Sequence, residues 1–111
     1  MSELLQQRCS NNPELAPRLS NAGCRELLSR LDSDWKLDLT LMTIARNYEF
    51  KNYYQTMAFA NSVAWIAHQQ DHHPEMLISY RHCAVRYSTH SVKGLSINDL
   101  ICAAQIDTLV K

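Results

Sequence analysis

One long helical pattern constrains the fold of this chain more than any other feature. Residues 53–70 carry two adjacent apolar rows, Phe59-Val63-Ile66 and Ala60-Ala64-Ala67, at the spacing of a helix that buries one face. Asn52, followed three residues later by Gln55, resembles a capping box at its start. The pattern ends at the His72-His73-Pro74 step, because proline pushes the residue before it toward an extended backbone.

Strand-like alternation of apolar and polar residues flanks this helix on both sides. Residues 35–40 and 42–50 precede the helix and predict two strands, which form an antiparallel hairpin although no Asn-Gly or Asp-Gly turn joins them. Residues 76–80 and 83–88 follow the helix and predict two more strands.

Two further helical patterns complete the order of elements. The first begins at Ser20, a favourable N-cap, and has an apolar face made by Cys24, Leu27, Leu28 and Leu31. Ser96 and Asp99 fit the Ser-x-x-acid signature that begins the last helix. The order αββαββα predicts an α+β, two-layer sandwich, in which a four-stranded antiparallel sheet carries three helices on one face.

The length of 111 residues fits a single domain with one core. Residues 1–19 contain two prolines and little apolar periodicity, so we expect a loosely ordered N-terminal extension without chemistry, followed by one domain over residues 20–111. Lysine plus arginine equals aspartate plus glutamate at 11 each, so no net field favours nucleic acid or anionic lipid. A small molecule or another protein is the expected partner.

The cysteines and the apolar runs bear on the compartment. The four cysteines are far apart and form no C-x-x-C pair, so we interpret them as free thiols: Cys9, Cys24, Cys83 and Cys102. Residues 1–15 do not resemble a signal peptide, and no stretch of about 18 uncharged apolar residues occurs. We therefore expect a cytoplasmic protein that does not associate with membranes.

Histidines are concentrated in one part of the chain, and five occur from residue 68 to residue 90: His68, His72, His73, His82 and His90. Imidazole titrates near neutral pH, so such a cluster suggests either acid–base catalysis or a metal site. His68 and His72 have the i, i+4 spacing of zinc-protease ligands, but Gln69 stands where the general-base glutamate belongs. Alternatively, the helix macrodipole favours protonated rings at a helix C-terminus, but this does not explain His90.

The order and spacing of these residues resemble the signature of the pterin-4a-carbinolamine dehydratase family. The matching elements are His68-x-x-x-His72-His73-Pro74, then Tyr80, His90 and Asp99. The neighbouring strings Asp71-His72-His73-Pro74-Glu75, Ser88-Thr89-His90 and Lys93-Gly94-Leu95-Ser96 also resemble that family. The similarity extends over residues 20–110, and the family has the αββαββα fold that the periodicity predicts independently.

The resemblance implies a dehydration reaction. Its substrate is the 4a-hydroxytetrahydropterin that aromatic amino acid hydroxylases release, and its product is a quinonoid dihydropterin, as required for tetrahydrobiopterin recycling. The reaction needs a base at ring nitrogen N5 and an acid at the departing C4a hydroxyl. The nitrogen lone pair expels the hydroxyl, so the resemblance implies no cofactor and no metal.

The family's site residues can be carried onto this sequence. The catalytic histidines become His72, His73 and His90, with His72 as the preferred base and either of the others as the acid. The pterin-binding residues become His72, His73, Pro74, Ser88, Thr89, His90 and Ser91. Three residues would support them: His68, which stands where animal enzymes carry a glutamate; Asp71, which could supply that carboxylate; and Asp99, whose simplest role is in the capping box begun by Ser96.

Members of the family form homodimers or homotetramers, which we also expect here. Two other functions stay open. Animal members also act as dimerisation partners of a homeodomain transcription factor, which is a protein-binding role. The histidine spacing leaves a zinc hydrolase as the remaining alternative.

Overall fold

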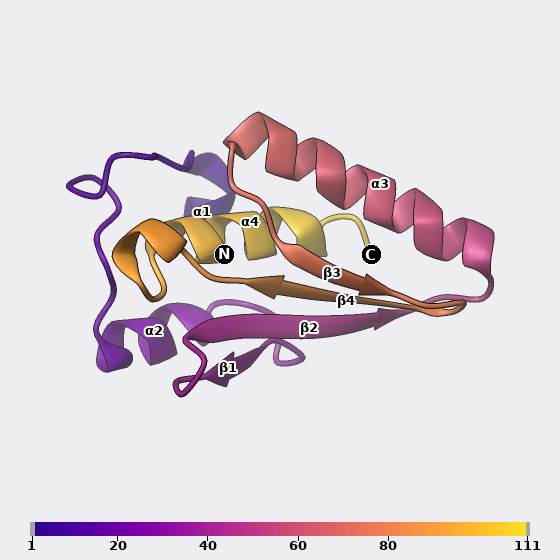
Figure 1. Cartoon of the computed structure of the whole chain (residues 1–111), viewed down its shortest axis with the longest axis horizontal. Helices are drawn as coiled ribbons and strands as arrows, with labels where there is room; N and C mark the ends of the chain where they lie inside the picture. Colours follow the sequence, from indigo (N-terminus) through magenta and orange to yellow (C-terminus); the bar gives the residue numbers. More distant parts are fainter. Residues whose placement is uncertain (1, 111) are drawn as a thin grey trace.

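The computed structural model describes residues 2–110 and has the predicted elements with two additions. The strands are β1 (Lys36–Asp38), β2 (Thr43–Glu49), β3 (Glu75–Ile78) and β4 (His82–Tyr87). They form one antiparallel sheet in the order β1-β2-β4-β3, which confirms the predicted α+β class (Figure 1). The predicted helices are α2 (Asn21–Leu28), α3 (Tyr53–Gln70) and α4 (Ile97–Asp107). The additions are α1 (Ser2–Gln6) and the 3-10 helix η1 (His90–Val92).

The register of the two central strands puts their apolar side chains on one face. Ile44 of β2 lies opposite Tyr87 of β4, and Tyr48 lies opposite Cys83. All four side chains are buried, whereas the alternating residues of both strands face the other side of the sheet. This is the half-buried pattern that the alternation of residue types predicts.

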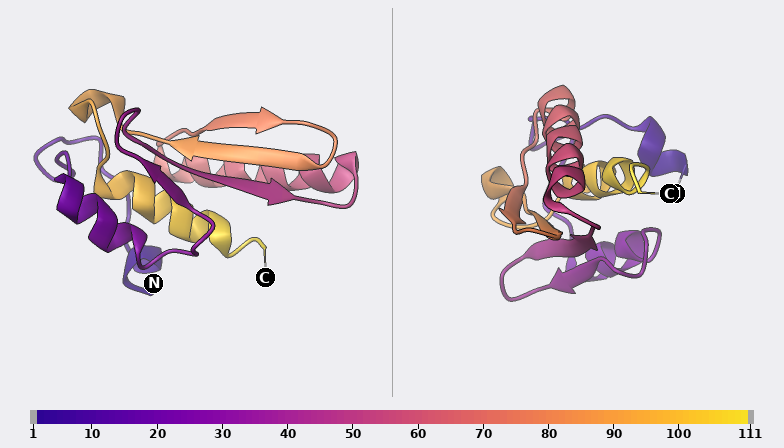
Figure 2. Two further views of the ribbon diagram at one scale, coloured as in Figure 1. Left: turned by 90° about the horizontal axis from the view of Figure 1, so that it is seen from below. Right: turned by 90° about the vertical axis from the view of Figure 1, so that its right-hand side faces the viewer.

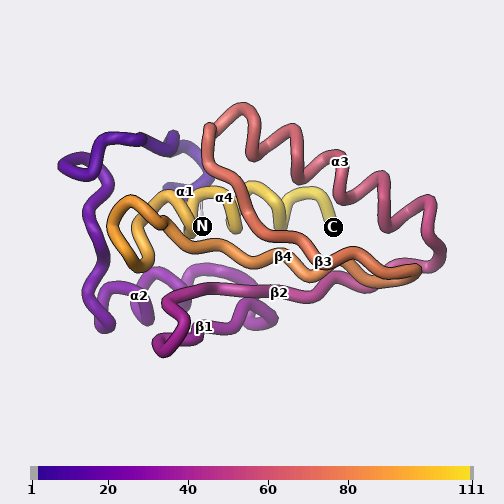
Figure 3. The backbone as a smooth tube through the Cα atoms, in the orientation of Figure 1, coloured from indigo at the N-terminus to yellow at the C-terminus, as the bar shows by residue number. Residues whose placement is uncertain are grey.

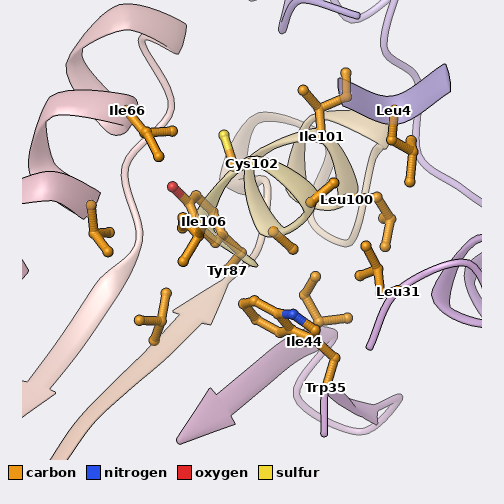
Figure 4. Packing of buried hydrophobic residues seen from close by; sticks show 14 of the residues in the cluster. Leu4, Leu31, Trp35, Ile44, Ile66, Tyr87, Leu100, Ile101, Cys102 and Ile106 are labelled. Carbon is orange, nitrogen blue, oxygen red and sulfur yellow. The ribbon is translucent and has the colours of Figure 1, made fainter. Parts of the chain in front are cut away.

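Helix α4 lies at the centre of the molecule and is buried nearly all round. Leu100 and Ile106 are 1% exposed or less, and the small side chains of Ala103 and Ala104 are also buried. Figure 2 shows α2, α3 and α4 on the same side of the sheet. Tyr87 extends from β4 into the packing around α4 (Figure 4). None of the described helices is long and apolar enough to cross a membrane.

The N-terminal segment differs from the loosely ordered extension that its composition suggests. Helix α1 packs on α4, and its Leu4 is only 1% exposed. The chain then passes around the end of the molecule where β4 leads into η1, as Figure 3 shows, and Ala16 is buried there. Leu19 donates its backbone N–H to the Leu95 carbonyl. Individual contacts hold this segment, and such contacts leave no periodic pattern in the sequence.

Candidate active site

The end of α3 sets the position of the paired histidines. The helix stops at Asp71, whose left-handed backbone (φ 51°) reverses the chain, and the His72 N–H bonds back to the Ala67 carbonyl at 3.1 Å. Pro74 follows, and β3 begins at the next residue. His72 and His73 therefore lie in a short connection between α3 and the sheet, as the His-His-Pro step predicts.

A tight loop after β4 presents the third histidine. Thr89 and Gly94 close this loop with two backbone hydrogen bonds, and η1 lies between them. His90 and Ser91 are exposed on it. Gly94 is closely packed: a Cβ there would lie 2.8 Å from Nε of Arg18, so the Arg18 side chain would have to shift. The N-terminal segment thus packs directly against the loop that carries His90.

Asp99 joins these two regions. It is fully buried in the first turn of α4, where Oδ2 accepts the Ser96 N–H at 3.0 Å and thereby forms the predicted capping box. The same oxygen accepts the Thr89 hydroxyl at 2.8 Å. Oδ1 lies 2.6 Å from Nε2 of His72. One carboxylate therefore caps the helix with one oxygen and holds a histidine ring with the other.

The surroundings of His72 determine its protonation. Burial lowers the pKa of His72, but the hydrogen bond to Asp99 and the charge of that carboxylate outweigh burial, so the pKa is raised above its ordinary value of 6.5. The ring stacks on Tyr87 with its centroid 5.2 Å away. Because the carboxylate accepts a hydrogen bond from Nε2–H, the neutral ring carries its lone pair on Nδ1.

A cavity of about 250 Å³ lies where these segments meet. Of the residues predicted for the site, it brings together Asp71, His72, His73, Ser88, Thr89, His90 and Ser91. Asp99 lies behind His72 rather than in the cavity wall. Pro74 and His68 are not among the described residues that line the cavity. His68 is exposed on α3, beside the Trp65 ring.

The cavity has a further wall that the sequence did not predict. It consists of Ser10, Asn11, Pro13, Ala16 and Asn98. Asn11 donates its side-chain N–H to Asp71 at 2.7 Å, next to the paired histidines. No recognisable motif marks these residues, because Asn-Asn-Pro indicates only a turn. The segment expected to carry no chemistry thus forms part of the cavity.

Within residues 2–110, no three His, Cys, Asp or Glu side chains are grouped so that they could hold a metal ion. The zinc-like spacing of His68 and His72 does not produce a shared site, because Nε2 of His72 bonds to Asp99 while His68 lies against Trp65.

Comparison with known proteins agrees with the fold and the motifs. Residues 17–109 match the family model for pterin 4 alpha carbinolamine dehydratase. The chain is 45% identical over 108 residues to a Nitrosomonas eutropha protein named "Putative pterin-4-alpha-carbinolamine dehydratase", covering 97% of this chain and 94% of the relative. A Nitrosospira multiformis protein of the same name is 46% identical over 109 residues, covering 98% and 94%. This chain belongs to the pterin-4a-carbinolamine dehydratase family.

Two solved structures share the fold. A transcriptional coactivator/pterin dehydratase from Brucella melitensis superposes with a TM-score of 0.80 at 29% identity, covering 85% of this chain and 99% of that one. A pterin dehydratase-like protein identified as a RuBisCO assembly factor in the alpha-carboxysome gives a TM-score of 0.60 at 18% identity, covering 68% and 88%. The second likeness concerns the fold alone.

Proposed function

We propose that this protein dehydrates 4a-hydroxytetrahydropterin to the quinonoid dihydropterin by histidine acid–base catalysis. The observation that carries the proposal is the 2.6 Å contact of His72 with the buried Asp99, at a cavity that His73 and His90 also line. An oriented imidazole with two others beside it supplies the base and the acid that the reaction needs. Family membership supports a pterin as the substrate class.

His72 is the base in this proposal. Asp99 fixes the tautomer that leaves Nδ1 free to accept the N5 proton, and the same carboxylate stabilises the imidazolium that forms. The raised pKa of His72 makes it a stronger base than an ordinary histidine, although only its neutral form can act. The rate should therefore rise with pH as His72 loses its proton.

His73 and His90 are the candidates for the acid. Both line the cavity and are exposed, so either ring can give a proton to the C4a hydroxyl in this proposal. The proposed pterin-binding groups are Ser88 and Ser91 beside the three histidines, because Pro74 lies outside the cavity wall and the backbone of Thr89 is paired with Gly94. The Thr89 hydroxyl is engaged by Asp99 and Ser96, so its role is to position Asp99.

A direct assay tests the proposal. Purified protein should accelerate the decay of chemically generated 4a-hydroxytetrahydropterin, with and without a chelator. The double variant His72→Ala/His90→Ala should lose that acceleration while retaining the fold by circular dichroism. Unchanged turnover in the double variant would refute the assigned site. Loss of activity to the chelator, restored by zinc, would favour a hydrolytic metal enzyme instead.

The physiological setting completes the proposal: tetrahydrobiopterin recycling after an aromatic amino acid hydroxylase, in the cytoplasm, by a homodimer or homotetramer. A protein-binding role is the second candidate, since the Brucella relative is named a coactivator as well as a dehydratase. Tyr54 and Trp65 on α3 are 83% and 60% exposed, an apolar surface that such a role could use. Light scattering would give the oligomeric state, and a protein without pterin turnover would favour the second role.

A further inference from the structure

Two thiols that are distant in the sequence meet next to the cavity. Sγ of Cys9 lies 3.6 Å from Sγ of Cys102, across 93 residues of sequence. Cys102 is fully buried on α4, one helical turn after Asn98 of the cavity wall, whereas Cys9 is partly exposed. The remaining cysteines, Cys24 and Cys83, are buried on α2 and β4.

Hydrogen bonds already hold the backbone of this pair in place. The Cys9 N–H donates to Oε1 of Gln70 at 2.8 Å, at the end of α3. Ser10 exchanges two bonds with the Asn98 side chain, at 3.1 and 2.8 Å. A disulfide needs an S–S distance of about 2.05 Å, so the two sulfur atoms have only about 1.5 Å to close. Most of the cost of bringing them together is therefore met by the fold.

The two thiols of the pair differ in how readily they ionise. The hydrogen bond with Cys102, together with burial, raises the pKa of Cys9. The same bond lowers the pKa of Cys102 against the effect of burial, and the Tyr87 hydroxyl adds to this. Cys102 is therefore the more readily ionised thiol, which suits the resolving partner in a disulfide exchange.

We propose that Cys9 and Cys102 form a reversible disulfide that fastens the N-terminal wall of the cavity to α4. With glutathione disulfide as oxidant, Cys9 reacts first because it is the more exposed thiol of the pair: its sulfur gives up its proton and attacks one glutathione sulfur, which releases one glutathione thiol and leaves a mixed disulfide. The Cys102 thiolate then attacks the Cys9 sulfur and expels the second glutathione. The protein loses two protons and two electrons, and one glutathione disulfide becomes two glutathione thiols.

The disulfide also affects the cavity. Closing the remaining gap draws Cys9 toward α4 and shifts the adjoining Ser10 and Asn11 of the wall slightly. Asn11 transmits the shift to Asp71 through its hydrogen bond. This consequence rests on the proposed dehydratase function, and we expect KM for the pterin to rise at least about threefold on oxidation.

Disulfide formation can be tested without any activity measurement. Reduced protein incubated with glutathione disulfide should lose about 2 Da in intact-mass analysis, and after denaturation two of its four cysteines should react with iodoacetamide. Dithiothreitol should reverse both changes. The melting temperature of the oxidised form should be at least about 5 °C higher, because the link closes a long loop.

Variants identify the pair. Cys102→Ser should retain a glutathione adduct on Cys9, a gain of about 305 Da, whereas Cys9→Ser should keep its mass because Cys102 is buried. Cys24→Ala is the matched control and should form the disulfide like the natural protein. Retention of all four thiols, a disulfide between two chains, or loss of the link in Cys24→Ala would overturn the proposal. A disulfide that leaves KM unchanged in an active enzyme would overturn its coupling to the cavity, and a disulfide in an inactive protein would refute only the dehydratase function.

Discussion

Helix α4 carries a buried carboxylate at each end, and the two have different surroundings. Asp107, at the last residue, accepts hydrogen bonds from Trp35 Nε1, the Tyr48 hydroxyl at 2.6 Å and Arg46 at 2.9 Å. Asp99, in the first turn, accepts from backbone and hydroxyl groups and from a histidine that faces the cavity.

The macrodipole accounts for part of this difference. A carboxylate is favoured at a helix N-terminus and disfavoured at a C-terminus, so Asp107 needs a positive partner and has one in Arg46, whose side chain is 13% exposed. Asp99 lies at the favourable end and needs no permanent positive charge, so it can be paired with His72, a group that changes its charge near neutral pH. A buried acid therefore does not by itself indicate an active site. A buried acid that is paired with a titratable side chain beside a cavity does.

The largest effect is expected at the structural end of α4. Asp107→Ala should lower the free energy of unfolding by about 3 to 5 kcal/mol, because the Trp35 indole N–H and the Tyr48 hydroxyl lose their acceptor. The largely buried Arg46 also loses its closest acid and keeps only Asp32 and Asp34, each at 3.6 Å. Urea unfolding measures this loss. Dehydratase activity per folded molecule should stay within about twofold, since Asp107 is far along α4 from the cavity residues. A large loss of activity in fully folded Asp107→Ala would remove the distinction between the two ends.

The corresponding change at the other end should act mainly on catalysis. Asp99→Asn should lower kcat about 100-fold, equivalent to about 2.7 kcal/mol, because His72 loses the anion that stabilises its protonated form. The pKa of His72 should fall toward its ordinary value, so the rising limb of the pH–rate profile should move to lower pH. A lower rate with an unshifted profile would mean that Asp99 has a structural role only.

The two ends should also differ in how stability depends on pH. The pKa of folded His72 is raised, so its protonated form stabilises the fold at pH values below about 6.5, and this contribution is lost as pH rises through the folded pKa. The unfolding free energy lost in His72→Gln should therefore be greater at pH 6 than at pH 9.

Trp35→Phe is the control for that measurement. It removes the indole N–H that bonds to Asp107, and an indole does not titrate between pH 6 and 9. The unfolding free energy lost in Trp35→Phe should therefore be the same at pH 6 and at pH 9. If the unfolding free energy lost in His72→Gln were equally independent of pH, the pKa of His72 would be the same in the folded and unfolded states.

These two ends also show what the sequence could predict. The Ser96–Asp99 capping box is a local pattern, and it was predicted and confirmed. The partnership of Asp99 with His72, 27 residues away, depends on how α3 ends against α4, and no spacing rule contains that geometry. Asp107 lacks any motif, because its partners are Trp35, which precedes β1, and Arg46 and Tyr48 on β2. The alternation in the strands and the rows on α3 predicted the layers, since periodicity reports which face is buried.

The smallest effect is expected in the wall that the sequence did not predict. Asn11→Ala removes the 2.7 Å bond to Asp71 and one polar group of the cavity, so KM for the pterin should rise about threefold while kcat is retained. Asn12→Ala is a matched control on the next residue: Asn12 bonds to the Glu14 N–H and does not line the cavity as described. The free energy of unfolding of both variants should lie within about 0.5 kcal/mol of that of the natural protein, because the two side chains are exposed. If the two variants raised KM equally, the N-terminal segment would act through its overall folding rather than through contact at the site.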